Sequence, residues 1–178
     1  MKIVRKILLG LLILIVLFVA VGYMLPGSFK VERSVVINAK PEVLYPYVAS
    51  LKDGWTQWNP FAEQDPGMVI SYSGPDTGVG ATSSWVSKKM GEGTQTITKA
   101  DTATGVETTL AFDHGQYQMQ GVIAFAPVDG GTKVTWTSGG DWGKQHLMFR
   151  YMGLMMNKMM GKTFEKGLQN LKTKAETK

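Results

Sequence analysis

An uncharged apolar run near the start of the chain is the feature that most restricts what this sequence can fold into. From Ile7 to Leu25, only two glycines and one tyrosine interrupt a succession of Leu, Ile, Val, Phe, Ala and Met. These nineteen residues, at ~1.5 Å per helical residue, come close to the hydrocarbon thickness of a bilayer. A buried core helix would show a polar face, and this run has none. We therefore predict a single-pass membrane anchor over residues 1–25.

Basic residues before the run predict its orientation. Lys2, Arg5 and Lys6 precede the apolar segment, and the positive-inside rule keeps such an end in the cytoplasm. Lys30 and Arg33 follow the segment and weaken this bias without reversing it. We expect a cytoplasmic N-terminus and a domain on the exported, periplasmic or extracellular side.

A cleaved signal peptide is the competing interpretation of the same segment. Ala20 and Gly22 form a small-x-small pattern before Tyr23. The apolar run is longer than the ~7–15 residues of a usual signal core, which favours an anchor that stays attached. Both interpretations export the domain. We predict residues 26–28 as a short linker and residues 29–178 as one domain.

Composition narrows the chemistry available to that domain. The chain has 178 residues and no cysteine, so disulfides, thiolate metal sites and cysteine nucleophiles are excluded. The formal charge is +5, but without the three basic residues of the anchor, residues 27–178 carry 16 basic and 14 acidic side chains, a net of +2. Nucleic-acid binding is not expected of an exported domain with so small a net charge.

Hydrophobic periodicity predicts an α+β domain. Residues 29–37 alternate apolar and polar side chains as a half-buried strand does, and residues 41–51 carry a helical stripe. Short runs separated by Gly, Pro and Asp then read as an antiparallel meander. These runs are Met68–Ser73, Ala81–Met90, Thr94–Ala100, Val106–Asp113, Tyr117–Ala126 and Thr132–Thr137.

The segment from about residue 145 to residue 174 predicts a long helix that covers the sheet. Six of the eleven methionines lie between Met148 and Met160. One apolar stripe at steps of four consists of Met152, Met156, Met160, Phe164 and Leu168. A second stripe, on another side of the helix, consists of Lys158, Lys162 and Lys166. It fits a solvated helix face and an approach to anionic headgroups equally well.

The order of these elements, and several segments, resemble the SRPBCC superfamily, the START-like group of polyketide cyclase/dehydrase type. The segments are VERSVVINAKPEVLYPYVASLKDGWTQWNPF, GVGATSSWVSKKMGEGTQTIT, GTKVTW and MMGKTFEKGLQNLK. The resemblance implies a helix-grip fold, with an antiparallel sheet of about six or seven strands wrapped on the C-terminal helix. It also implies an apolar cavity for lipids, polyketides or other hydrophobic molecules.

Methionines and aromatic residues are the candidates for lining such a cavity. Methionine is flexible and polarizable, which suits a wall that adapts to varied ligands, and Trp or Tyr adds a few oriented hydrogen bonds. The alternative is that these side chains fill an ordinary core. The candidate ligand-binding residues are Trp58, Trp85, Phe112, Tyr117, Met119, Trp136, Met152, Met156 and Met160.

The sequence offers no convincing motif for catalysis, metal binding or cofactor binding. The two histidines, His114 and His146, form no obvious dyad with a neighbouring acid, and no nucleophile elbow or zinc-ligand spacing occurs. GPDTGVG at residues 74–80 lacks the context of a phosphate loop and reads as a turn. Lys88, Lys89 and Glu92 read as solvated charges around a turn, with a guard for a cavity mouth as the alternative.

These observations favour a membrane-tethered, non-catalytic module that binds a hydrophobic small molecule, such as a lipid. No cofactor and no metal is expected, and the sequence names no protein partner. Two other functions stay open. One is a cyclase or isomerase for a hydrophobic substrate, which needs an acid or base inside the cavity. The other is an envelope interaction module with a filled core.

Overall fold

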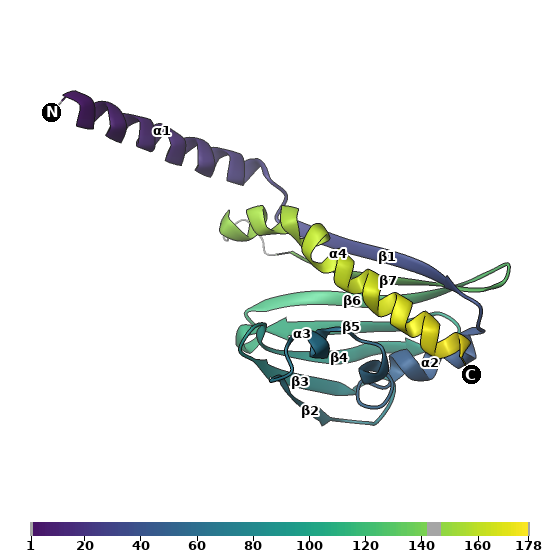
Figure 1. Ribbon diagram of the computed structural model, residues 1–178. Helices are drawn as coiled ribbons and strands as arrows, with labels where there is room; N and C mark the ends of the chain where they lie inside the picture. Colours follow the sequence, from purple (N-terminus) through teal and green to yellow (C-terminus); the bar gives the residue numbers. More distant parts are fainter. Residues whose placement is uncertain (1, 142–146, 178) are drawn as a thin grey trace.

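The computed structural model describes residues 2–141 and 147–177 and confirms the predicted helix-grip architecture behind a long apolar N-terminal helix (Figure 1). The helices are α1 (Lys2–Met24), α2 (Pro41–Ala49), α3 (Phe61–Gln64) and α4 (Leu147–Glu176), with short 3-10 turns η1 (Trp55–Gln57) and η2 (Asp113–Gly115). The strands are β1 (Ser28–Ile37), β2 (Val69–Ser73), β3 (Thr82–Ser87), β4 (Gly91–Asp101), β5 (Gly105–Phe112), β6 (Tyr117–Val128) and β7 (Gly131–Asp141).

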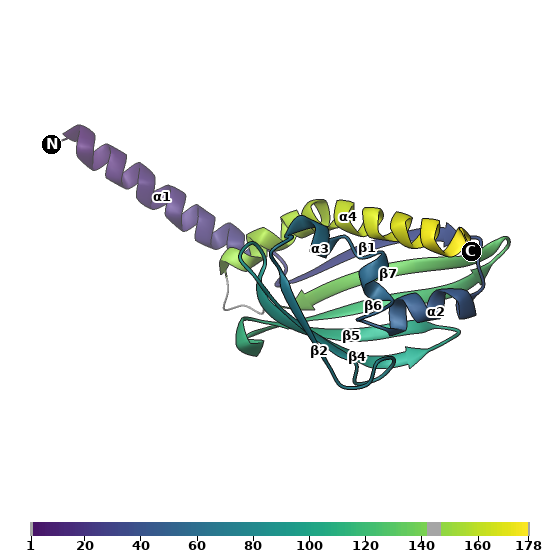
Figure 2. The same ribbon diagram turned by 60° about the horizontal axis from the view of Figure 1, so that its bottom comes forward.

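The seven strands form one antiparallel sheet in the order β1-β7-β6-β5-β4-β3-β2. Consecutive strands from β2 to β7 pair as a meander, and β1 closes the order by pairing with β7. Helices α2 and α4 lie on the same face of the curved sheet (Figures 1 and 2). We call this the inner face. It is the face that the long helix was predicted to cover.

Alternation along the strands decides which side chains reach the inner face. Val31 and Ile37 of β1 are fully buried there, and Val134 and Trp136 of β7 lie beside them. Helix α4 completes this core with the C-terminal half of its length. Its buried apolar residues are Phe164, Leu168, Leu171 and Ala175.

The turn between β3 and β4 lies earlier in the chain than the sequence predicted. The run Ala81–Met90 was predicted as one strand, but β3 ends at Ser87 and β4 begins at Gly91. The Ser87 hydroxyl accepts hydrogen bonds from the backbone N–H groups of Lys89 (3.2 Å) and Met90 (2.9 Å). A side-chain bond of this kind offers the backbone an alternative to the ladder, and it turns the chain here.

Helix α1 stands out from the domain and meets it only near its own C-terminal end, where α4 begins (Figures 1 and 2). Among the described residues, it is the one helix long and apolar enough to cross a membrane. Gly22 makes the contact close, because a Cβ there would lie 2.5 Å from Leu147 Cδ1. The Tyr151 ring stacks on Phe18 with centroids 4.4 Å apart.

Candidate functional site

The inner face divides into two halves. In the filled half, around Trp136, the aromatic rings are buried. In the half-open half, around Phe112, the aromatic rings stay partly exposed. In the filled half, Trp136 stacks on Phe164 with ring centroids 4.0 Å apart and an interplanar angle of 2°. Trp58 meets Trp136 edge to face at 5.2 Å, and its indole Nε1 donates to the Tyr47 carbonyl at 2.9 Å. Trp58 is 1% exposed and Trp136 is 4% exposed. These two predicted cavity residues therefore pack against other aromatic rings.

A glycine on α4 makes this packing possible. A Cβ at Gly167 would lie 2.8 Å from Trp136 Cζ3 and 3.0 Å from Pro60 Cδ. Real Cβ atoms do not approach that closely without displacing a neighbour. At Gly167 the helix therefore packs directly on the tryptophans that fill this space.

In the half-open half, cross-strand neighbours form a row of side chains on the inner face. The register pairs Trp85 of β3 with Gly93 of β4, Gly93 with Phe112 of β5, and Phe112 with Tyr117 of β6. We call Trp85, Phe112 and Tyr117 the aromatic row. Each of the three is half-buried, in contrast to the filled half.

Gly93 is the spacer that lets the row close up. A Cβ at this position would lie 2.3 Å from Trp85 Cζ2, so the indole lies directly over the glycine. The Trp85 and Phe112 rings then meet edge to face at 5.6 Å. Such pairs contribute ~0.5–1.5 kcal/mol beyond the apolar area that they bury.

Helix α4 reaches the aromatic row through its first turn. The Phe149 and Tyr117 ring centroids lie 5.0 Å apart. Met156 and Met160 are half-buried and pack against the core. Phe149 was not among the predicted residues, although steps of seven and four place it on the same side of the helix as those two methionines.

The structure separates Met152 from the other predicted methionines. It is 42% exposed, whereas Met119 on β6 is buried at 7%. A residue four positions along a helix turns about 40° past one full turn, so three steps from Phe164 to Met152 rotate the side chain by about 120°. The drift carries Met152 off the face that meets the sheet.

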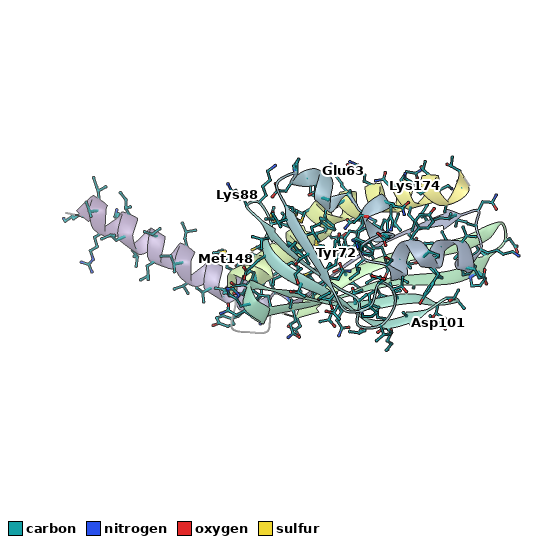
Figure 3. All side chains as sticks on the ribbon, turned by 90° about the horizontal axis from the view of Figure 1, so that it is seen from below. Glu63, Tyr72, Lys88, Asp101, Met148 and Lys174 are labelled. Carbon is teal, nitrogen blue, oxygen red and sulfur yellow. The ribbon has the colours of Figure 1, made fainter. Side chains whose placement is uncertain are left out.

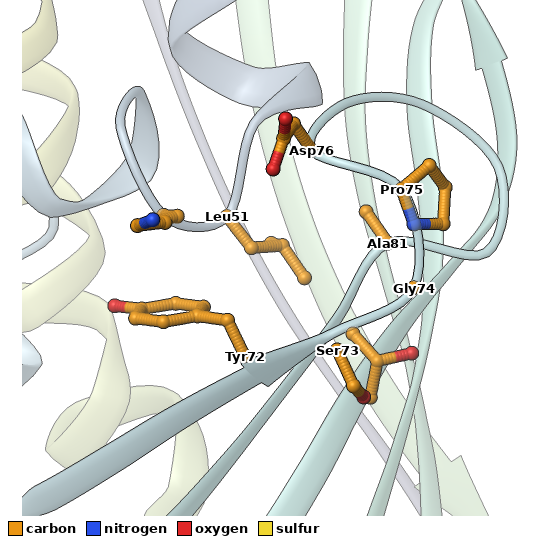
Figure 4. A pocket seen from close by; sticks show the side chains of 9 residues that line it. Leu51, Tyr72, Ser73, Gly74, Pro75, Asp76 and Ala81 are labelled. Atoms are coloured by element: carbon orange, nitrogen blue, oxygen red, sulfur yellow. The ribbon is translucent and has the colours of Figure 1, made fainter.

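Two hollows lie elsewhere on the described part of the chain. A small one of ≈ 130 Å³ lies between the loop after α2 and the β2–β3 turn, where Leu51 and Ala81 face Tyr72 (Figure 4). Burial and the charge of Asp53 raise the pKa of Tyr72. No predicted cavity residue lines this hollow.

The larger hollow measures ≈ 510 Å³ and includes Trp85 but no other predicted residue. Ser84, Val86 and Thr94 line it. Their strand positions have the opposite parity to Trp85 and Gly93, so these side chains belong to the outer face of the sheet. His114 and Glu92 close one end, with Nδ1 and Oε1 2.9 Å apart. His146 lies outside the described residues.

Asp65 and Arg33, two ionisable groups near the inner face, form hydrogen bonds within the domain. The Asp65 carboxylate accepts from the Ser87 hydroxyl at 2.6 Å and from the Gly67 backbone N–H at 3.1 Å. The Ser87 bond is the main reason why the pKa of Asp65 lies below its usual value. Arg33 of β1 donates to Glu165 at 2.6 Å and to Asn157 at 2.8 Å.

The lysines singled out in the sequence lie on the surface. Lys158, Lys162 and Lys166 are exposed, and Lys166 pairs with Glu63 of α3. Lys88 is exposed, and Lys89 donates to the Gln64 carbonyl at 3.1 Å. Within residues 2–141 and 147–177, no group of three or more His, Asp and Glu side chains could hold a metal ion.

The aromatic row lies at the end of the domain that faces α1. Lys88, from the β3–β4 turn, and Met148, from the start of α4, are found at this end, whereas Asp101 and Lys174 are found at the opposite one (Figure 3). The contacts from Tyr117 to Phe149, and from Tyr151 to Phe18, connect the row to the apolar helix. The aromatic row therefore lies close to the apolar helix α1.

Comparison with known proteins agrees with this architecture. A family model described as polyketide cyclase / dehydrase and lipid transport matches residues 28–176. Helix α1 lies outside the matched range. No curated protein sequence matches the chain.

Solved structures with low sequence identity share the fold. A protein of unknown function from Staphylococcus aureus is 16% identical, with a TM-score of 0.62 over 84% of this chain and 94% of that one. The di-domain ARO/CYC StfQ from the steffimycin biosynthetic pathway is 10% identical, with a TM-score of 0.59 over 84% of this chain and 51% of that one. Ara h 8.0201 is 13% identical, with a TM-score of 0.54 over 85% and 99%.

Proposed function

The chain belongs to the polyketide cyclase / dehydrase and lipid transport family, and from that membership we propose that it is a membrane-tethered module that binds a hydrophobic small molecule of the lipid class. The ligand lies on the inner face of the sheet, against the aromatic row. The family description fits both binding and chemistry, so the choice between them depends on this chain's own residues.

The half-buried state of the aromatic row is the observation that carries the proposal. Trp85, Phe112 and Tyr117 face the helix side of the sheet and keep part of their ring surface open, while Trp58 and Trp136 are closed off. Covering a further ~50 Å² of each open ring with an acyl chain contributes about 1 kcal/mol per ring. Three adjacent rings therefore favour an apolar ligand.

Helix α1 supplies the tether in this proposal. Its apolar length fits one bilayer crossing. Lys2, Arg5 and Lys6 favour a cytoplasmic N-terminus, which places the domain on the exported side. The short connection between Met24 and Ser28 then holds the domain next to the membrane surface.

The state of the buried ionisable groups supports binding without chemistry. Asp65 is the buried carboxylate of the described residues, and both of its oxygens accept hydrogen bonds. A carboxyl group with a lowered pKa is ionised near neutral pH and is therefore a poor proton donor. Its bonds attach the loop before β2 to the end of β3, which is a structural role.

The filled half favours a second function, the envelope interaction module. There the Trp136–Phe164 stack and the surrounding rings leave the helix tightly packed on the sheet. In this alternative, no lipid occupies the aromatic row, and the surface of the domain carries the function. The absence of a bound lipid distinguishes this alternative from the proposal.

Native mass spectrometry of the full chain, released from membranes in mild detergent, tests the proposal. We expect a copurified lipid on the wild-type chain and about fivefold less retention in Phe112→Ala, because one ring contact worth ~1 kcal/mol is lost. Val86→Ala is the matched control, since Val86 lies on the outer face and lines the ≈ 510 Å³ hollow.

The pattern of loss decides the outcome. Equal retention in both variants and in the wild-type chain would show that the lipid is annular and bound to α1. Loss in Val86→Ala alone would move the site to the outer face. A wild-type chain without lipid would favour the interaction module.

A further inference from the structure

The first half of α4 presents an exposed apolar stripe. Its exposed fractions are 63% for Met148, 42% for Met152, 59% for Met155 and 61% for Met159. Steps of four, three and four residues keep the four side chains within about 60° of each other around the helix, over roughly 17 Å of its length. We call these four residues the methionine stripe. Patches of this kind on soluble domains mark contact sites.

The contact between α4 and α1 places this stripe at the level of the membrane. Phe18 lies seven residues before Leu25, the end of the apolar run, which corresponds to about 10 Å along a helix. The Tyr151 ring stacks on Phe18 with an interplanar angle of 7°, and its hydroxyl donates to the Phe18 carbonyl. A span that ends at Leu25 therefore carries Tyr151 below the bilayer surface.

Arg150 holds the two helices in this arrangement. Its guanidinium donates to the carbonyls of Gly22 (3.3 Å), Tyr23 (3.0 Å) and Leu25 (2.9 Å). The last carbonyls of a helix have no partner within it, and a cation is stabilised at that end of the helix dipole. Arg150 is only 4% exposed, so the junction is well packed.

The charge of this half of α4 fits a lipid surface. Residues 147–164 contain no Asp or Glu. Arg150 is buried in the junction with α1, whereas Lys158 and Lys162 are exposed. Basic and apolar side chains without acids are typical of helices that lie in the interface of a bilayer with anionic lipids, with the apolar face buried ~5–10 Å deep. That depth matches the level of Tyr151.

We propose that the first half of α4 is a second membrane contact, with the methionine stripe among the acyl chains of the leaflet into which α1 runs. This inference rests on the proposed tether. Phe149 belongs to the same helical turns and touches Tyr117. The aromatic row then opens next to the bilayer, and a lipid reaches it without crossing water.

The absence of cysteine makes the test direct, since every introduced cysteine is unique. We place single cysteines by Met155→Cys in the stripe, Gln169→Cys on the exposed distal half of α4, and Leu14→Cys inside α1. Each full-length variant carries an environment-sensitive fluorophore and is reconstituted in vesicles of phosphatidylcholine and phosphatidylglycerol. Spin-labelled lipids in the same vesicles quench fluorophores that lie at acyl-chain depth.

We expect strong quenching and blue-shifted emission at positions 14 and 155, and solvent-like emission at 169. Quenching at 14 with solvent-like emission at 155 overturns the second contact and leaves the tether intact. Solvent-like emission at 14 overturns the tether, and with it this inference. Blue-shifted but unquenched emission at 155, with disulfide-linked dimers of unlabelled Met155→Cys, assigns the stripe to a second copy of the chain and overturns it too.

Discussion

The division of the inner face into a filled and a half-open half predicts opposite outcomes for the same substitution. Phe164 is 1% exposed and stacks on Trp136 at 4.0 Å. Phe112 is half-buried and meets Trp85 edge to face at 5.6 Å. Replacing either residue with alanine removes one phenyl ring, but only one of the two leaves an enclosed cavity.

The expected magnitudes follow from burial. Phe164→Ala loses a fully buried ring and leaves a cavity between α4 and β7, which costs ~3–5 kcal/mol of unfolding free energy. Phe112→Ala loses a partly exposed ring and one edge-to-face contact and leaves no enclosed cavity, which costs ~1–2 kcal/mol. For a domain of this size, the two losses lower Tm by about 2–4 °C per kcal/mol.

Urea and thermal unfolding of the full chain in a mild detergent measure both losses. Trp58 and Trp136 lie in the filled half, so the change in tryptophan fluorescence reports the unfolding of the domain. Lipid retention is measured on the same samples. Phe164→Ala should be the more destabilised variant and Phe112→Ala the one that loses lipid.

The reasoning is refuted if the two variants lose the same unfolding free energy. That result would mean that Phe112 is enclosed as completely as Phe164, and the inner face would have no open half. A Phe112→Ala variant of unchanged stability and unchanged lipid retention would equally remove the aromatic row as a site.

Two further predictions concern glycines and a carboxylate. Gly153→Ala should raise the unfolding free energy by up to ~1 kcal/mol, because its Cβ would meet only Phe29 Cβ at 3.6 Å; Gly167→Ala, which clashes with the packed tryptophans, should lower it by up to ~2 kcal/mol in the same urea titration. Ser87→Ala should raise the pKa of Asp65 in an NMR titration. The stabilisation from a lowered carboxyl pKa is present above the unfolded pKa of ~3.9 and is lost as the pH falls through the folded pKa. Acid unfolding should therefore begin at a higher pH in Ser87→Ala than in the wild-type chain. An unchanged pH midpoint of acid unfolding would contradict the role of that hydroxyl.

The elements and their order were predictable because each produces a local periodicity of apolar residues in the sequence. Alternation over residues 29–37 predicted β1, and the runs between Gly, Pro and Asp predicted the meander of β2 to β7. The fold is confirmed by the family match over residues 28–176. The boundary between β3 and β4 was missed because the Ser87 side chain turns the chain there, and a hydroxyl gives no periodic signal.

The candidate site was only partly predictable. Trp85, Phe112 and Tyr117 were named from the sequence, yet nothing local distinguishes them from Trp58 and Trp136. The difference comes from α4, which packs closely over Trp136 at Gly167 and leaves the aromatic row half-covered.

By itself the sequence determined an apolar helix of bilayer length, an antiparallel sheet and a long covering helix, since these depend on the polarity of residues near each other in the chain. Only the tertiary structure decided which rings stay half-open, and that Arg150 caps α1 from more than a hundred residues away. Stripes at steps of four and at steps of seven differ by a few tens of degrees around a helix, and only packing against β1 and α1 selects the face that is buried.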